Sequence, residues 1–227
     1  MCLILLAWKV HARFPLLVAA NRDEYHARPA ERAAFWRDRP AVLAGRDLEA
    51  SGTWMGVARS GKFSAVTNYR GAHEPRAVES RGQLVTRFLD NGTAPAEYVR
   101  DVSARGSGYS GFNLLASDGD ELWWVSNRGG SPHRLEPGIY GLGNHLLNAD
   151  EAVVREGKAR LAACLVAPSL ESLFALLLPA KIIAPVYGTR CSTVLAAEDS
   201  GRVSYAERAF DAAGNEGETL RYEFAAG

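Results

Sequence analysis

The sequence predicts a layered α+β fold in which β-sheets are covered by helices. Along the chain, groups of predicted strands alternate with groups of predicted helices, in the order strands, helices, strands, helices and strands. In a βαβ protein, by contrast, each strand is followed by one helix. The chain has 227 residues, 47% of them hydrophobic and 23% charged, which is typical of a globular protein that buries a substantial core. We see no internal repeat or linker, so we expect a single domain over residues 1–227.

The first element is a β-hairpin. Residues 3–10 and 16–20 are continuous apolar runs of strand length, and the short polar link between them contains Pro15. The second run ends on Asn21, Arg22, Asp23 and Glu24. Four polar residues at the end of a buried strand indicate a functional site or a turn.

The hydrophobic pattern weakens in residues 25–50, where Pro29, Pro40 and Gly45 interrupt it. We expect a loop-rich segment there with one helical turn. Residues 52–58 and 62–69 then predict a second hairpin around a Ser-Gly turn, which leaves Asn68 near the end of a strand.

Helices and strands complete the prediction in order. Apolar residues at helical spacing predict helices over residues 79–90 and, more weakly, 94–105. A further helix is expected from the Asn148 cap, with Glu151 at its third position, and another over residues 170–178 after a Ser169 cap. The remaining strands are expected at residues 112–117, 122–126, 138–140, 192–197, 203–210 and 220–224.

Charge and cysteine content exclude several classes of protein. Lys plus Arg and Asp plus Glu both number 26, so nothing favours a nucleic-acid partner. Three scattered cysteines predict no disulfide framework and a reducing compartment. Because the first apolar run lacks the features of a signal peptide and residues 173–179 are too short to span a bilayer, we expect a cytoplasmic protein without a transmembrane segment.

Cofactor motifs are absent or out of context. Residues 106–111 match G-x-G-x-x-G, but a predicted helix precedes them and a strand follows, which is the reverse of a dinucleotide-binding turn. The five histidines are dispersed, so we predict no metal site. Haem needs only one or two axial ligands, so it remains an alternative ligand rather than an expected cofactor.

Cys2 is the most informative single residue. If Met1 is removed, Cys2 has both a thiol nucleophile and an α-amine whose pKa near ~8 suits proton transfer at neutral pH. The alternative is that Cys2 is a small apolar residue at the start of a buried strand.

Several motifs together resemble those of one family. These are Met-Cys at residues 1–2, Asn-Arg-Asp-Glu at 21–24, the Ala-Gly-Arg-Asp-Leu-Glu-Ala-Ser-Gly-Thr-Trp-Met-Gly-Val run at 44–57, Thr-Asn-Tyr-Arg at 67–70, Gly-Phe-Asn-Leu-Leu at 111–115, Ser-Asn-Arg at 126–128 and Tyr-Gly-Thr-Arg-Cys-Ser-Thr-Val at 187–194. The chain resembles the NRDE family, which includes the transport and Golgi organisation proteins, from residue 1 to about residue 210. One departure is Cys191, where the family pattern predicts a small residue such as serine.

The resemblance implies an N-terminal-nucleophile (Ntn) hydrolase-like fold, a four-layer αββα sandwich with two antiparallel sheets. The cysteine branch of that superfamily cleaves non-peptide amide bonds. Carried over by motif, Cys2 is the nucleophile, Asp23 lies next to it, and Asn68 lends its amide to an oxyanion hole. Asn144 is the second asparagine near the nucleophile's amine, and Arg190 supports the site. The alternative for each asparagine is a turn residue that bonds local backbone.

Two functions are consistent with this resemblance. The first is hydrolysis, through Cys2, of a non-peptide amide or related acyl bond in a small, apolar ligand. The second is a non-catalytic carrier or chaperone for haem or for a lipid or acyl-CoA, since NRDE proteins are linked to haem trafficking and lipid handling. We assign ligand contacts to Asn21, Arg22, Glu24, Trp54 and Tyr69, with Arg46 or Arg70 as further partners for a ligand carboxylate or phosphate. The alternative for the aromatic residues is an ordinary place in the core.

Overall fold

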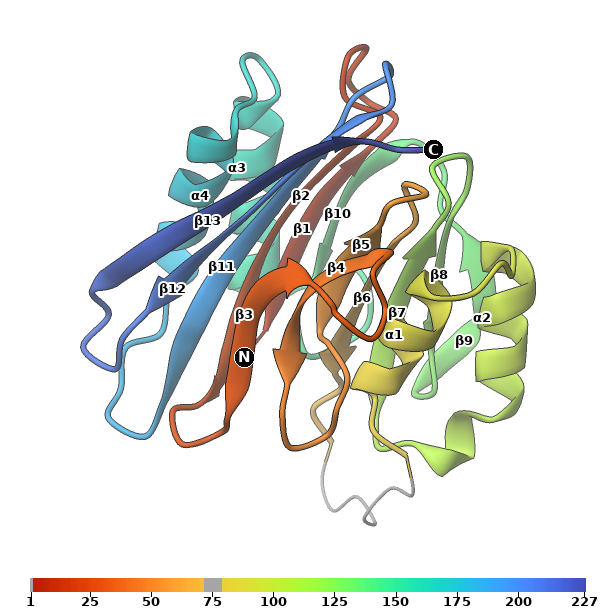
Figure 1. Cartoon of the computed structure of the whole chain (residues 1–227), viewed down its shortest axis with the longest axis horizontal. Helices are drawn as coiled ribbons and strands as arrows, with labels where there is room; N and C mark the ends of the chain where they lie inside the picture. Colours follow the sequence, from red (N-terminus) through yellow and green to blue (C-terminus); the bar gives the residue numbers. More distant parts are fainter. Residues whose placement is uncertain (1, 72–78) are drawn as a thin grey trace. The chain divides into compact units, whose positions relative to one another are not determined.

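The computed structural model describes residues 2–71 and 79–227, and the chain divides into two compact units, each with one antiparallel sheet (Figure 1). Unit 1 comprises residues 1–28, 137–143 and 147–225, and unit 2 comprises residues 29–136, 144–146 and 226–227. The elements follow the expected order of strands, helices, strands, helices and strands, which confirms the α+β prediction.

Unit 1 contains a six-stranded sheet in the order β10-β1-β2-β11-β12-β13. Helices α3 and α4 cover it: α3 packs on β1 and β10, and α4 packs on β2 and β11. The core between sheet and helices includes Leu3, Leu5, Leu17, Leu161 and Phe174. Its elements are β1 (Leu3–Trp8), β2 (Leu16–Tyr25), β10 (Gly138–Leu142), α3 (Ala152–Cys164), α4 (Leu170–Leu177), a 3-10 turn η2 (Leu178–Ala180), β11 (Tyr187–Ala197), β12 (Arg202–Phe210) and β13 (Glu216–Ala225).

Unit 2 contains a seven-stranded sheet in the order of the chain, from β3 to β9. Helix α1 packs on β4 to β7, and α2 packs on β7 to β9. The core includes Phe88, Tyr98, Val99, Phe112 and Leu114. Its elements are β3 (Ala30–Phe35), β4 (Val42–Asp47), β5 (Met55–Ala58), β6 (Phe63–Asn68), α1 (Gly82–Leu89), α2 (Pro95–Ala104), a 3-10 turn η1 (Gly106–Gly108), β7 (Phe112–Ser117), β8 (Leu122–Ser126) and β9 (Gly129–Arg134).

The prediction of a loop-rich segment over residues 25–50 is wrong, because this segment forms β3 and β4. Pro29 lies just before β3, and Pro40 lies in the connection between the two strands, so neither interrupts a strand. As an edge strand, β3 buries only Ala33 and therefore shows no clear hydrophobic alternation. Pairing with β4, rather than local sequence preference, makes it a strand.

Two other boundaries differ from the prediction. Strand β2 continues through the polar residues to Tyr25, because β11 pairs with it along that whole length. Helix α3 begins at Ala152, not at an Asn148 cap. Asn148 adopts a φ of 57° in a turn, where its side-chain oxygen accepts hydrogen bonds from Gly141 N at 3.0 Å and Lys158 Nζ at 2.9 Å. Strand β9 was not predicted at all.

The predicted cap of α4 is confirmed. The Ser169 side chain accepts a hydrogen bond from Ser172 N at 3.1 Å, and Ser172 Oγ accepts one from Ser169 N at 2.9 Å. Across residues 2–71 and 79–227, the helices are too short or too polar for any of them to cross a membrane.

Candidate functional site

Cys2 and Asp23 meet at one end of the sheet in unit 1. Cys2 precedes β1, which pairs with β2 so that Leu3 faces Asn21. The partly buried Cys2 thiol points at the backbone carbonyl of Asp23, with an Sγ–O distance of 3.8 Å. The hairpin that the apolar runs predicted therefore brings the two residues together. Met1, whose removal would free the α-amine of Cys2, lies outside the described residues.

Two residues of β11 fix Asp23 in place. Thr189 Oγ1 donates a hydrogen bond to Asp23 Oδ1 at 2.6 Å, and Tyr187 Oη donates one to the Asp23 carbonyl at 3.0 Å. The Asp23 side chain is thus aligned by the neighbouring strand. The sequence does not predict the Thr189 contact, although Thr189 lies in the Tyr-Gly-Thr-Arg motif, because the register of β2 with β11 cannot be deduced from residue types alone.

Burial sets the ionisation of both groups. Burial raises the pKa of the Cys2 thiol, and the nearby Asp23 carboxylate raises it further. Burial also raises the pKa of Asp23, while the hydrogen bond from Thr189 works in the opposite direction. At neutral pH Cys2 is therefore a thiol, not a thiolate, and it needs a base to become a nucleophile.

The other polar residues of β2 have different environments. Asn21 is buried, and its side chain links Ser192 Oγ at 2.7 Å to the Leu177 carbonyl at 3.3 Å, so it joins strand to helix. Arg22, also buried, lies opposite Cys191, where its charge lowers the thiol pKa of both Cys191 and Cys2 against the dominant effect of burial. Glu24 accepts a hydrogen bond from Tyr25 N at 2.8 Å. The ligand contacts predicted for these three residues stay a prediction.

Arg190 supports the turn after β2. Its Nη1 donates hydrogen bonds to the carbonyls of Tyr25, His26 and Arg28 at 2.9, 3.1 and 3.1 Å. This contact is structural, and it holds the chain that follows Asp23.

Unit 2 brings together Asn68 and Asn144. Asn144 is buried, and its Nδ2 donates to the Asn68 carbonyl at 2.7 Å, while its own carbonyl accepts from Arg70 N at 2.7 Å. Asn68 is exposed at the end of β6. Tyr69 packs edge-on against His145, with ring centroids 5.8 Å apart. Asn68 lies at the end of β6, as predicted, and the predicted roles of Asn68, Tyr69 and Asn144 remain predictions.

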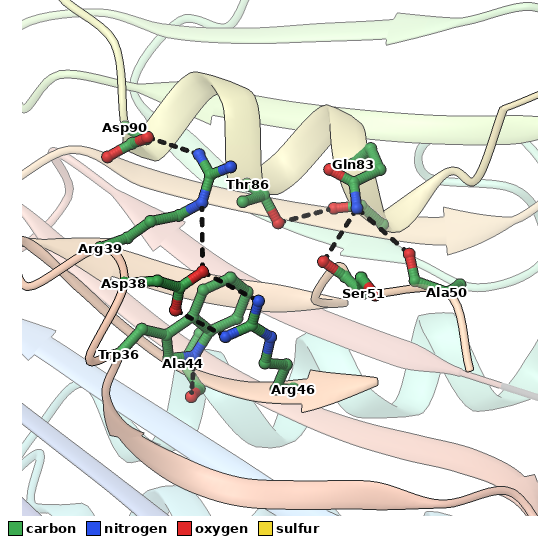
Figure 2. Close-up of polar contacts among 11 residues, drawn as sticks. Trp36, Asp38, Arg39, Ala44, Arg46, Ala50, Ser51, Gln83, Thr86 and Asp90 are labelled. Atoms are coloured by element: carbon green, nitrogen blue, oxygen red, sulfur yellow. Dashed lines mark hydrogen bonds and ion pairs between the residues drawn. The ribbon is translucent and has the colours of Figure 1, made fainter. Parts of the chain in front are cut away.

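The turn before Trp54 is tightly held in unit 2. Figure 2 shows Gln83, at the start of α1, donating to the carbonyls of Ala50 and Ser51 at 3.1 and 2.8 Å. Trp54 follows this turn and is partly buried.

Arg46 belongs to the same part of unit 2. It forms two hydrogen bonds to Asp38, at 2.6 and 3.0 Å, and its guanidinium lies 4.4 Å from the Trp36 ring centroid (Figure 2). Because Arg46 already pairs with a carboxylate, it is a poor candidate for binding a ligand carboxylate.

The chain matches the family model of Transport and Golgi organisation 2 over residues 1–179. A Transport and Golgi organization protein 2 homolog from Bos taurus is 35% identical, over 86% of this chain and 86% of that protein. The homolog from Homo sapiens is 33% identical, over 93% of this chain and 92% of that protein.

Two solved structures show the fold. The N-acylethanolamine-hydrolyzing acid amidase ortholog of Caenorhabditis elegans aligns with a TM-score of 0.57 at 11% identity, covering 86% of this chain and 92% of that one. A mutant of the conjugated bile acid hydrolase from Clostridium perfringens aligns with a TM-score of 0.58 at 10% identity, covering 100% and 98%. Both are Ntn hydrolases.

Proposed function

The chain belongs to the Transport and Golgi organisation 2 family and has an Ntn-hydrolase-like fold, and from this we propose that it is a cysteine hydrolase. Its substrate is a small, apolar ligand with a non-peptide amide or related acyl bond. The observation that carries the proposal is the Cys2 thiol, directed at the Asp23 carbonyl while Thr189 holds the Asp23 carboxylate. Two proteins of this fold, by their names, hydrolyse N-acylethanolamines and conjugated bile acids.

The ionisation of Cys2 defines what the reaction needs. Because the thiol pKa is raised, proton removal requires a nearby base, and the α-amine of Cys2 supplies it after Met1 is removed. The amine takes the thiol proton while sulfur attacks the substrate carbonyl. The tetrahedral intermediate expels the leaving amine, which receives that proton, and a thioester remains. Water then attacks the thioester, and the thiol is regenerated as the carboxylic acid leaves.

The experiment is acylation of the purified full-length protein with 4-nitrophenyl octanoate. We expect intact mass spectrometry to show a protein without Met1 that gains one octanoyl group, and peptide mapping to place that group on Cys2. Cys2→Ala should lose the label. Cys164→Ser is the matched control, because Cys164 is also partly buried but lies at the end of α3.

Retention of Met1 in protein that still turns over the ester would contradict the proposal, because the α-amine base would be missing. Equal labelling of the wild type and Cys2→Ala would also contradict it.

A further inference from the structure

Asn113 is a fully buried polar residue of unit 2 to which the proposed reaction gives no role. It lies near the start of β7, in the Gly-Phe-Asn-Leu-Leu run of residues 111–115. Strand β7 pairs with β6 so that Asn113 faces Thr67. A buried side-chain amide needs partners for its donors and its acceptor, and those partners show what the side chain holds in place.

The side-chain nitrogen of Asn113 bonds to neighbours of two predicted site residues. Nδ2 donates to Thr67 Oγ1 at 3.2 Å and to the His145 carbonyl at 2.9 Å. Thr67 directly precedes Asn68, and His145 directly follows Asn144. One side chain of β7 therefore links the two chain segments that contain the site asparagines of unit 2.

Backbone hydrogen bonds join the same segments close to Asn68. Tyr69 N donates to the Gly111 carbonyl at 2.8 Å, and Arg70 N donates to the Asn144 carbonyl at 2.7 Å. The Asn68 carbonyl accepts from Asn144 Nδ2 at 2.7 Å. The main chain at Asn68 is therefore held from two sides, while Asn68 itself is exposed.

The side-chain oxygen of Asn113 is in a different situation. It is buried, and no donor within residues 2–71 and 79–227 bonds to it. The opposite orientation of the amide would set this oxygen against the His145 carbonyl, so the observed orientation is favoured. A buried oxygen without a donor destabilises the fold, and an apolar side chain of similar size would avoid that loss. Stability alone therefore does not explain an asparagine here, whereas the two bonds from Nδ2 do.

We propose that Asn113 is a positioning residue for the side-chain amide of Asn68. The inference rests on the proposed function, with Asn68 as the donor to the oxyanion that forms when Cys2 attacks a substrate carbonyl. Asn113 acts through the backbone that it holds and does not touch the substrate. A donor whose backbone is already fixed stabilises the developing charge without reorganisation, which is what makes an oxyanion contact effective.

The test is a double-mutant cycle on Cys2 acylation by 4-nitrophenyl octanoate. The saturating rate and the ester concentration for half-saturation are measured separately. Asn113→Leu keeps the approximate size of the side chain and removes both donors, so we expect the saturating rate to fall roughly tenfold at an unchanged half-saturating concentration. In the Asn68→Ala background, the same substitution should lower the rate by less than about twofold, because the donor that it positions is gone.

Ser64→Ala is the matched control. Ser64 is a fully buried residue of β6 whose Oγ donates to the Leu115 carbonyl of β7 at 2.7 Å, so this variant also loses a buried hydrogen bond between the two strands. It should keep the wild-type saturating rate. Thr67→Val removes the oxygen that accepts from Asn113 and should lower the rate, whereas Thr67→Ser keeps it and should not. If Asn113→Leu does not fold, Thr67→Val takes its place in the cycle.

Amide hydrogen exchange, followed by NMR, separates this inference from the hydrolase proposal because it needs no activity. The Arg70 amide is protected by its bond to the Asn144 carbonyl. Asn113→Leu removes the bond to the neighbouring His145 carbonyl, so we expect the Arg70 amide to exchange roughly tenfold faster than in Ser64→Ala. If exchange responds in this way but the wild type is never acylated, the hydrolase proposal fails and Asn113 still fixes the backbone at Asn68.

Two results overturn the inference and leave the hydrolase proposal intact. One is an equal fold-loss of the acylation rate in the wild-type and Asn68→Ala backgrounds, which would show that Asn113 acts independently of Asn68. The other is an Asn113→Leu variant with an unchanged saturating rate and unchanged exchange of the Arg70 amide.

Discussion

The two units hold their predicted site residues in different ways. In unit 1, Asp23 is buried and bonded through both its carboxylate and its carbonyl, and Asn21 is buried between strand and helix. In unit 2, the side-chain amide of the buried Asn144 donates a hydrogen bond to the carbonyl of Asn68, and Asn68 itself is exposed at the end of β6. Residues with the same polar chemistry are structural supports in some positions and exposed groups in others.

Burial and hydrogen bonding indicate which of these residues can be changed without loss of the fold. A buried polar side chain with partners leaves those partners unsatisfied when it is removed, so its loss lowers stability. An exposed side chain has no such cost, so its loss affects only what it binds. Measurements of stability and acylation should therefore separate the buried polar residues from the exposed Asn68.

Asn68→Ala has the largest expected effect on activity. The family resemblance assigns Asn68 the oxyanion contact, and removal of one such donor lowers the rate about 10²-fold or more. Because Asn68 is exposed, the substitution should change the free energy of unfolding by less than about 0.5 kcal/mol. Cys2 acylation and urea denaturation measure the two quantities. An unchanged acylation rate would remove Asn68 from the proposed site.

Thr189→Val has the largest expected effect on stability. It removes the hydroxyl that donates to Asp23 at 2.6 Å and accepts from Ile182 N at 2.8 Å. The loss should lower the free energy of unfolding by roughly 1–3 kcal/mol in urea denaturation. Thr189→Ser keeps the hydroxyl, so its free energy of unfolding should fall by less than that of Thr189→Val. If both variants are equally stable, the hydroxyl is not what holds Asp23.

Asn144→Ala should have a smaller effect, and it removes the hydrogen bond from Asn144 Nδ2 to the Asn68 carbonyl. We expect a loss of about 0.5–1.5 kcal/mol in the free energy of unfolding. Asn68→Ala serves as the control in the same urea titration. The contrast between buried and exposed polar residues weakens if Asn68→Ala and Asn144→Ala give the same loss.

Asp23→Asn is the mildest change, since asparagine has nearly the same shape and keeps an oxygen to accept from Thr189. Burial raises the pKa of Asp23, so its protonated form is the one that folding favours. That contribution is fully present below the usual pKa of 3.8 and is lost as the pH rises through the raised value. Asparagine mimics the protonated form, so we expect the variant to gain thermal stability over the wild type at pH 7.

The gain should shrink as the pH approaches 3.8, which thermal denaturation at pH 4 and pH 7 measures. A gain of the same size at both values would show that Asp23 ionisation does not limit stability. Cys2 acylation in this variant reports whether the carboxylate is needed for the reaction.

The sequence was informative where local preferences agree with the fold. The apolar runs predicted the hairpin of β1 and β2, the Ser-Gly turn predicted that of β5 and β6, and Ser169 predicted the start of α4. It failed for β3, whose residues show no alternation because only Ala33 is buried. It also failed at the start of α3, where Asn148 bonds a neighbouring strand instead of capping the helix.

By itself, the sequence determined the family, the order of elements and the presence of Cys2 beside an Asn-Arg-Asp-Glu strand end. Residue types and their spacing along the chain are enough to predict these properties. Only the tertiary structure decided that Thr189 and Tyr187 hold Asp23 and that Asn144 supports Asn68. Thr189 and Asp23 are far apart in the chain, and their contact follows from the register of two paired strands, which depends on packing across the whole sheet.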